Sequence, residues 1–359
     1  MAESEKLWEL PAHRLMSLSD LKGSVDADAA LHLPDLVYDV AGTTHSLNFN
    51  IVPLSEILGP EEKDVVGLRI DRDRDTNPRS DNYIFTKWSR SQLLSLMGTK
   101  EKWFSFVGQE REAEELNARL HALNRFNLRT MRTVDSDFPA CVVRGIVSAE
   151  YADIPNTDIM KSVVETVPEN SMALKYHSGL TDRAFYAYIM SPTPITIPNT
   201  TFFGYPGVVV KNSEVGYTSL WVIPSLVLRK HGAPIVIETK AVLRRVHRGK
   251  IDLSAKFAEA FKSCAATWTD MASKIPGLVQ ASYGTEDAAV AHMERLLARC
   301  NAKKEFSALC SSTYRSQQRA HTGLDIFEAI TEACATYSDR DESYEVGAIA
   351  GAVLYLLVF

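Results

Sequence analysis

Residues 229–250 concentrate positive charge in this 359-residue chain, and positive side chains bind phosphate groups. The segment contains seven lysines and arginines and one acid, Glu238, although the whole chain has a formal net charge of −6 at pH 7. The segment therefore carries +6, and the other 337 residues carry −12. A basic segment on an acidic chain is typical of a surface that meets a polyanion. The seven cations are Arg229, Lys230, Lys240, Arg244, Arg245, Arg248 and Lys250.

The charge of this segment does not identify the polyanion, and nucleic acid is the first hypothesis. A protein that holds a strand without reading its sequence needs cations along the backbone and aromatic rings for the bases. His247 would add to the cations where it is protonated, and Trp221 and Tyr217 are nearby candidates for base stacking. The alternative is that the basic run is a solvated face and that Trp221 fills the core.

A strand at the end of this segment would present only part of the charge to a ligand. Side chains of a strand alternate between its two faces. Arg244, Val246 and Arg248 would then share one face, and Arg245 and His247 would share the other.

Glu238 and Lys240 also permit a different chemistry. They end the apolar run I-V-I-E-T-K, in which a carboxylate and a lysine follow a predicted strand. With a second carboxylate, for which Glu214 is the candidate, they would hold Mg²⁺ and activate water as a nuclease does. Because Glu-x-Lys often ends a strand by chance, the alternative for Glu238 is an ordinary residue of a paired strand.

Other catalytic patterns do not occur in the sequence. It has no G-K-[ST] phosphate loop, G-x-G-x-x-G, H-E-x-x-H or G-x-S-x-G motif, and its nine histidines lack the spacing of metal ligands. We therefore predict no metal and no cofactor. Enzymatic activity stays open, with a non-enzymatic protein favoured.

Composition indicates a protein with a core and no export signal. The chain is 45% hydrophobic and 23% charged, which is enough for one large domain or two modest ones. Its five cysteines contain no C-x-x-C pair, and its first residues are acidic, so we predict a cytoplasmic protein with free thiols. Residues 346–359 are uncharged but too short to cross a bilayer; we expect a buried terminal element, with a protomer interface as the alternative.

The hydrophobic pattern predicts an α+β fold with a central antiparallel or mixed sheet flanked by helical segments. We divide the chain into an irregular, strand-containing amino-terminal segment (1–88), an α+β core (89–262) and a helical subdomain packed on that core (263–359). Predicted strands cover 37–40, 45–52, 141–148, 185–190, 207–211, 219–223, 226–228 and 234–238. Predicted helices lie at 91–97, 110–126, 256–261, 287–299 and 325–333, with another beginning near residue 158.

Several dispersed stretches are similar to a family of phage and plasmid proteins known only as a domain of unknown function. They are R-G-I-V-S-A-E-Y (144–151), I-P-N (154–156), V-V-K-N-S-E-V-G (209–216), S-L-W-V-I-P (219–224), R-V-H-R-G (245–249), D-I-F-E-A-I-T (325–331) and A-G (350–351). N-S-E-V-G is the most specific of them. The chain departs from the family at residues 229–233, where R-K-H-G-A replaces a Cys-Asn-Gly-like segment.

The resemblance implies a role in DNA metabolism and a kinship with single-strand annealing proteins. Together with the basic segment, it predicts a phage- or plasmid-type protein of the bacterial cytoplasm that binds single-stranded DNA and anneals it in recombination, as a homo-oligomer and without a cofactor. The first alternative is a non-enzymatic phage assembly protein or an inhibitor of a host defence. The second is the Mg²⁺-dependent nuclease.

Overall fold

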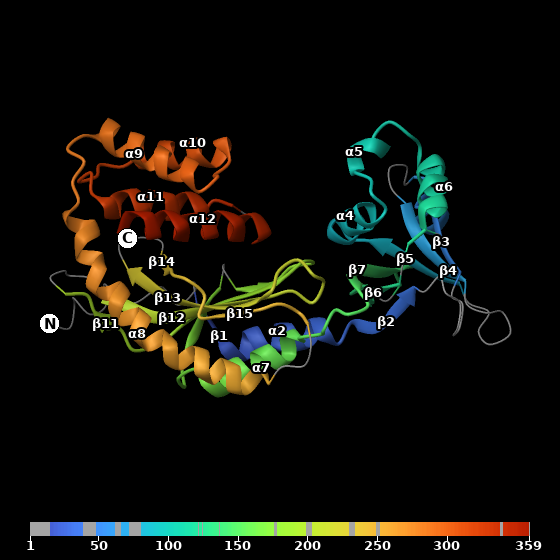
Figure 1. Cartoon of the computed structure of the whole chain (residues 1–359), viewed down its shortest axis with the longest axis horizontal. Coiled ribbons are helices and arrows are strands. Elements are labelled where there is room, and N and C mark those ends of the chain that lie inside the picture. The colour runs from blue at the N-terminus through green and yellow to red at the C-terminus, as the bar shows by residue number, and fades with distance from the viewer. Residues whose placement is uncertain are drawn as a thin grey trace.

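The computed structural model describes residues 15–38, 48–61, 66–71, 80–120, 122–123, 125–135, 137–175, 178–198, 203–229, 234–248, 252–337 and 340–358. In this part of the chain the strands form two sheets, which belong to two lobes (Figure 1). The predicted α+β class is confirmed, and the strands divide between two sheets where the sequence analysis expected one.

The large sheet is antiparallel and has the order β1-β8-β10-β12-β13-β14, with β9 beside β10, β11 beside β12 and β15 beside β13. All six residues of β10 are buried, because packed side chains cover both of its faces. This burial explains why the sequence there is a continuous apolar run. The strands are β1 (Leu15–Ser17), β8 (Met172–Leu174), β9 (Gly179–Leu180), β10 (Phe185–Met190), β11 (Ile195–Thr196), β12 (Phe203–Asn212), β13 (Leu220–Arg229), β14 (Pro234–Glu238) and β15 (Leu243–Arg245).

Helices pack on both faces of the large sheet and complete the large lobe (Figure 1). One face is covered by α2 (Leu18–Ala29), α7 (Asn156–Thr166) and α8 (Leu253–Gln280). On the other side α11 (Gly323–Cys334) and α12 (Arg340–Val358) meet β14, with α9 (Glu286–Arg299) and α10 (Lys304–Arg315) packed on them. Local signals set several of these helix starts: Asp252 caps α8, and Thr322 and Asp325 form a capping box on α11.

The carboxyl-terminal apolar segment is part of the core. Val346, Ala350, Val353 and Leu354 of α12 are buried against α11 and neighbouring helices, which confirms the predicted burial. Gly347 and Gly351 let α12 lie close to the sheet, since a Cβ on Gly351 would stand 3.4 Å from Glu238 Cβ. Among the described helices, none is long and apolar enough to cross a membrane.

The small lobe is built on a mixed sheet of order β2-β6-β7-β5-β4-β3, in which β5 and β7 are parallel. Its core lies between this sheet and the neighbouring helices, where Leu116 and Leu120 of α6 are buried. The strands are β2 (His32–Tyr38), β3 (Asn48–Pro53), β4 (Val66–Asp71), β5 (Ser80–Phe85), β6 (Phe126–Met131) and β7 (Cys141–Ser148). The helices are α3 (Ser55–Leu58), α4 (Lys87–Leu96), α5 (Glu101–Phe104) and α6 (Gln109–Leu120).

The small lobe is inserted into the large one. The chain leaves the large lobe after α2 and returns at α7, and β1 pairs with β8 across the insertion. The predicted division after residue 88 falls within α4 of the small lobe, and the division after residue 262 falls within α8. Residues 71–79, which contain the alternating charges of D-R-D-R-D, lie mostly outside the described part of the chain.

Candidate nucleic-acid interface

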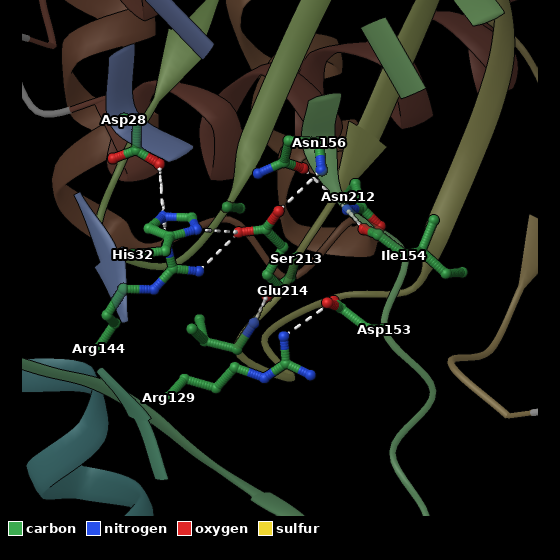
Figure 2. A network of polar contacts seen from close by, with 12 residues as sticks. Asp28, His32, Arg129, Arg144, Asp153, Ile154, Asn156, Asn212, Ser213 and Glu214 are labelled. Carbon is green, nitrogen blue, oxygen red and sulfur yellow. Dashed lines mark hydrogen bonds and ion pairs between the residues drawn. The ribbon is translucent and has the colours of Figure 1, made fainter. Parts of the chain in front are cut away.

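A loop between β12 and β13 joins the two lobes through a network of polar contacts (Figure 2). Glu214 stands at its centre: Arg144 Nη2 of β7 donates to Glu214 Oε2 at 2.6 Å, and the Asn156 backbone N–H of α7 donates to Oε1 at 2.8 Å. Asn212 Nδ2 donates to Ile154 O at 2.9 Å and to Asn156 Oδ1 at 2.8 Å. Arg144 and Glu214 are both buried, and because an unpaired buried charge is costly, each stabilises the charge of the other.

Carboxylates outnumber guanidinium groups around Arg144 in this network. Asp28 Oδ2 lies 2.9 Å from His32 Nε2 and 3.8 Å from Arg144 Nη1, so two carboxylates, those of Asp28 and Glu214, surround one guanidinium. A pocket of about 300 Å³ opens beside them, with Arg183 and Asp182 on its wall. Because the anions offset Arg144, the network is suited to joining the lobes and not to binding phosphate.

Two glycines are required here, one in β7 where the loop approaches it and one in the loop itself. A Cβ on Gly145 of β7 would stand 2.4 Å from Val215 Cβ, so the strand and loop approach too closely for any side chain there. Gly216 has a φ of +78°, in the left-handed region. The carbonyl of Val215 accepts from Trp88 Nε1 at 3.1 Å and Gln92 Nε2 at 2.8 Å, which ties the loop to α4.

The network around Glu214, which consists of Asp28, His32, Arg144, Ile154, Asn156, Asn212 and Glu214, is called the joint below. Several of the stretches that carry the family resemblance meet there. N-S-E-V-G forms the loop, R-G-I-V-S-A-E-Y supplies Arg144 and Tyr151, and I-P-N supplies Asn156. The stretch R-V-H-R-G also reaches it, since His247 stacks on Tyr151 with ring centroids 4.7 Å apart. These dispersed residues therefore have a shared structural explanation.

A row of alternating aromatic and cationic residues crosses the large sheet next to the joint. Strand register places Tyr186 opposite Lys211, Lys211 opposite Trp221, and Trp221 opposite Arg244. Residues directly opposite each other in an antiparallel sheet share a face. Tyr186, Lys211, Trp221 and Arg244 therefore lie side by side across β10, β12, β13 and β15.

Two cations on this side of the sheet rest on aromatic rings. The guanidinium carbon of Arg244 lies 4.6 Å from the Trp221 ring centroid, and that of Arg183 lies 5.0 Å from the Tyr217 ring centroid. Trp88 meets Tyr217 edge to face at 5.1 Å. Trp221 is half-buried, and its Nε1 has no hydrogen-bond partner in the described part of the chain, which is uncommon for a buried donor.

The other predicted cations do not gather at one point. Lys240 lies over the Tyr355 ring of α12 at 5.3 Å, and Arg245 Nη2 donates to the Arg248 carbonyl at 2.7 Å. The exposure alternates as predicted, although β15 ends at Arg245: Arg244, Val246 and Arg248 are exposed, Arg245 is partly covered and His247 is buried. Arg229 ends β13, and Lys230 and Lys250 lie outside the described residues. Within the described ranges, Arg244, Arg248 and Lys240 form no ion pair.

His247 does not join the exposed cations. Only 3% of its surface is accessible, and its Nδ1–H donates to the Ala152 carbonyl at 3.1 Å. Burial lowers the pKa of His247 below its usual value of 6.5, although the Ala152 carbonyl opposes this shift. His247 is therefore neutral near pH 7 and supports the joint from within.

The lowered pKa of His247 predicts a loss of stability on acidification. Below about pH 6.5 the unfolded chain binds a proton at this residue while the folded protein does not, so stability falls as pH falls. His247→Gln should show a smaller drop in the free energy of unfolding between about pH 7 and about pH 5 in urea titrations. Equal drops in parent and variant would show that His247 does not titrate in this way.

Glu238 and Glu214, the candidate pair of a nuclease, belong to separate networks. Glu238 pairs with Lys211, whose Nζ lies 3.4 Å from Oε2, and Glu214 pairs with Arg144. In the described ranges, His, Cys, Asp and Glu side chains form no group of three or more that could hold a metal ion. Glu238 is thus placed as a paired-strand residue, the alternative that the sequence analysis left open.

Sequence reasoning missed four residues of this region: Arg183, Tyr186, Lys211 and Arg144. Arg183 and Lys211 lie outside the basic segment, and the strand register that brings Lys211 and Tyr186 beside Trp221 is a long-range property. The signal that was present is the lysine at position 211 within an otherwise apolar run.

Comparison with known proteins found no relative: no family model matches the sequence, and no curated protein or solved structure matches it.

Proposed function

We propose that this protein binds single-stranded nucleic acid on the face of the large sheet beside the joint, with Arg244 and Trp221 at the centre of the contact. The observation that carries the proposal is the Arg244 guanidinium 4.6 Å from the Trp221 ring, exposed and unpaired with any described carboxylate. A cation held by a ring remains available to phosphate, because an exposed cation–π contact is worth only about 0.5–1 kcal/mol. The half-buried ring beside it supplies the apolar surface that a base stacks on.

Neighbouring groups extend this contact. Arg183 on Tyr217 repeats the arrangement of a cation on a ring, and Arg248, four residues after Arg244, is also exposed. The contact pattern has cations for phosphates and rings for bases, which favours binding without sequence reading. Phosphate neutralisation lowers the repulsion between two strands, so pairing of complementary strands in a phage or plasmid recombination pathway belongs to the same proposal. A cytoplasmic homo-oligomer remains the expected form.

The experiment is fluorescence anisotropy with a labelled single-stranded oligonucleotide of about 20 nucleotides, at low and physiological salt. Arg244→Ala with Arg245→Ala should weaken binding about tenfold, and the slope of log affinity against log salt should fall by about 0.7 for each phosphate that the variant no longer neutralises. Lys262→Ala is the control, because Lys262 is exposed on α8, which covers the opposite face of the sheet.

Three results would contradict the proposal or part of it. Equal binding by parent and double variant would remove Arg244 and Arg245 from the contact. The titrations are repeated with Mg²⁺ and all samples are run on a gel; DNA fragments that form only with Mg²⁺ would point to the nuclease. Absence of binding by the parent protein at both salt concentrations would overturn nucleic-acid binding and leave the assembly or inhibitor protein.

A further inference from the structure

The tip of the small lobe exposes two aromatic rings. Trp103 is 66% exposed and Phe106 is 86% exposed, and Val107, next in the chain, is also on the surface, as is Leu96 at the end of α4. Phe104 between the two rings is buried in the core of the small lobe. Exposed large apolar groups that lie together on a folded protein indicate a binding surface. We call residues 100–107 the aromatic tip.

The aromatic tip is an ordered turn. The Trp103 N–H donates to the Lys100 carbonyl at 2.9 Å, and the Val107 N–H donates to the Phe104 carbonyl at 3.1 Å. Ser105 Oγ donates to the Lys102 carbonyl at 2.9 Å. With Phe104 as an anchor, these bonds hold the turn in place before any ligand binds, which lowers the entropy lost on binding.

Two exposed lysines belong to the same turn as the two rings. Lys100 and Lys102 are exposed, and neither forms an ion pair with a described carboxylate. The acid between them, Glu101, pairs with Arg90 Nη1 at 2.8 Å, and Arg90 also pairs with Glu112, so three cations face two acids here. Two flat rings next to two free lysines suit a ligand with stacking bases and phosphates.

A groove beside α4 runs from the joint to Leu96, which precedes the aromatic tip by four residues in the chain. It has a volume of about 580 Å³ and runs beside α4, where Trp88 and Gly216 line its end at the joint. Leu96, the last residue of α4, also lines it, and Ser91, Ser95 and Arg125 supply polar groups in its wall. Ten residues of α4 span about 15 Å, which leaves room for a few nucleotides.

We infer that the groove and the aromatic tip form a second contact region for the same single strand, in which Trp103 and Phe106 stack on bases. This inference rests on the proposed function. Nucleic acid is favoured over a lipid or protein partner, because the groove begins at Trp88, which touches Tyr217 of the proposed interface. It ends at Leu96, close in the chain to the exposed lysines and rings of the tip. The strand would pass from Arg244 and Arg183 past Trp88 and along α4.

The test compares variants of the full chain in the same anisotropy titration. Trp103→Ala with Phe106→Ala should bind a strand of about 20 nucleotides at least about fivefold more weakly than the parent. Trp103→Phe should retain most of the affinity, because it keeps a ring for stacking. Val134→Ser is the matched control, since Val134 is an exposed apolar residue of the small lobe that does not line the groove.

The outcomes separate the two proposals. If Arg244→Ala with Arg245→Ala weakens binding but the tip variant binds as the parent does, the tip inference is wrong and the proposed function stands. If the parent itself does not bind DNA, both proposals are wrong. If the tip variant keeps its DNA affinity and loses binding to phosphatidylserine vesicles, the tip meets lipid and the inference is overturned.

A spectroscopic measurement shows directly whether a base reaches Trp103. DNA should quench the tryptophan fluorescence of the parent more than that of Trp103→Phe, because a stacked base quenches an indole that the variant lacks. Equal fractional quenching in the two proteins would contradict stacking at Trp103, even if affinity falls in the alanine variant.

Discussion

Glu214→Ala is expected to lower the free energy of unfolding by about 3–5 kcal/mol, one of the two largest effects predicted for this chain. The substitution leaves the buried Arg144 guanidinium without the carboxylate that lies 2.6 Å from it. It also removes the acceptor of the Asn156 N–H at the start of α7. Asp28 stands too far away, at 3.8 Å from Arg144 Nη1, to replace the missing hydrogen bond. Urea titration at about pH 7 measures the change.

An exposed ion pair provides the control for Glu214→Ala. Lys22 and Asp26 form an i,i+4 pair on α2 with both side chains exposed, so Lys22→Ala should cost less than about 1 kcal/mol. Glu214→Gln keeps an oxygen acceptor and should fall between the two. A loss below about 1 kcal/mol for Glu214→Ala would show that water reaches Arg144 and that the joint is not a buried network.

Helices with strong local signals were predicted from the sequence. The helix expected near residue 158 begins at Asn156, and the helix expected at 256–261 belongs to α8, which Asp252 caps. The helix α2 was missed, because its sequence is polar and only Leu21 and Val25 are buried along one narrow face. A helix with so little apolar surface depends on the partner it packs against, and local pattern does not contain that partner.

The hydrophobic pattern of the sequence did not predict that the strands form two sheets. Alternation and apolar runs locate strands, but they do not say which strands pair. Leu15 lies opposite Leu174, on the far side of the inserted small lobe. Such pairing depends on the whole fold, and its signal is spread over residues distant in the chain. The two-lobed arrangement therefore emerged only from the structure.

The candidate interface was predicted in part. The basic segment and Trp221 could be found because charge and aromatic character are visible in single residues. His247 was expected among the cations, but burial against Tyr151 and Ala152 removes it from the surface. Glu214 was considered as a metal ligand, because nothing in the sequence shows that Arg144, 70 residues away, would neutralise it. The sequence shows the type of each residue, but it does not show which residues His247 and Glu214 contact in the folded protein.

Glu238→Ala should also lower the free energy of unfolding, by about 3 kcal/mol at about pH 7. Lys211 and Glu238 are both largely buried, and the variant would leave the ammonium without its carboxylate. Burial already lowers the pKa of Lys211 in the parent, although Glu238 opposes this shift. Without Glu238 the pKa should fall further, since the opposing charge is gone.

Because the loss of stability in Glu238→Ala comes from the buried charge of Lys211, it should depend on pH. A lysine whose pKa is lower in the folded protein binds fewer protons there than in the unfolded chain, so stability rises with pH between the two pKa values. The deficit of Glu238→Ala relative to the parent should therefore shrink between about pH 7 and about pH 9.5. A deficit that stays constant over this range would show that the charge of Lys211 does not cause it.

A double variant separates charge from packing at the same site. Lys211→Met with Glu238→Leu replaces both charges by apolar groups of similar volume and should recover most of the stability that Glu238→Ala loses. The row of Tyr186, Lys211, Trp221 and Arg244 makes the double variant informative for binding too, because it leaves Trp221 and Arg244 in place. If Lys211 acts only within the core, DNA affinity should be unchanged. If affinity falls while stability is restored, Lys211 contributes charge to the interface, and the contact extends across the sheet from β15 to β12.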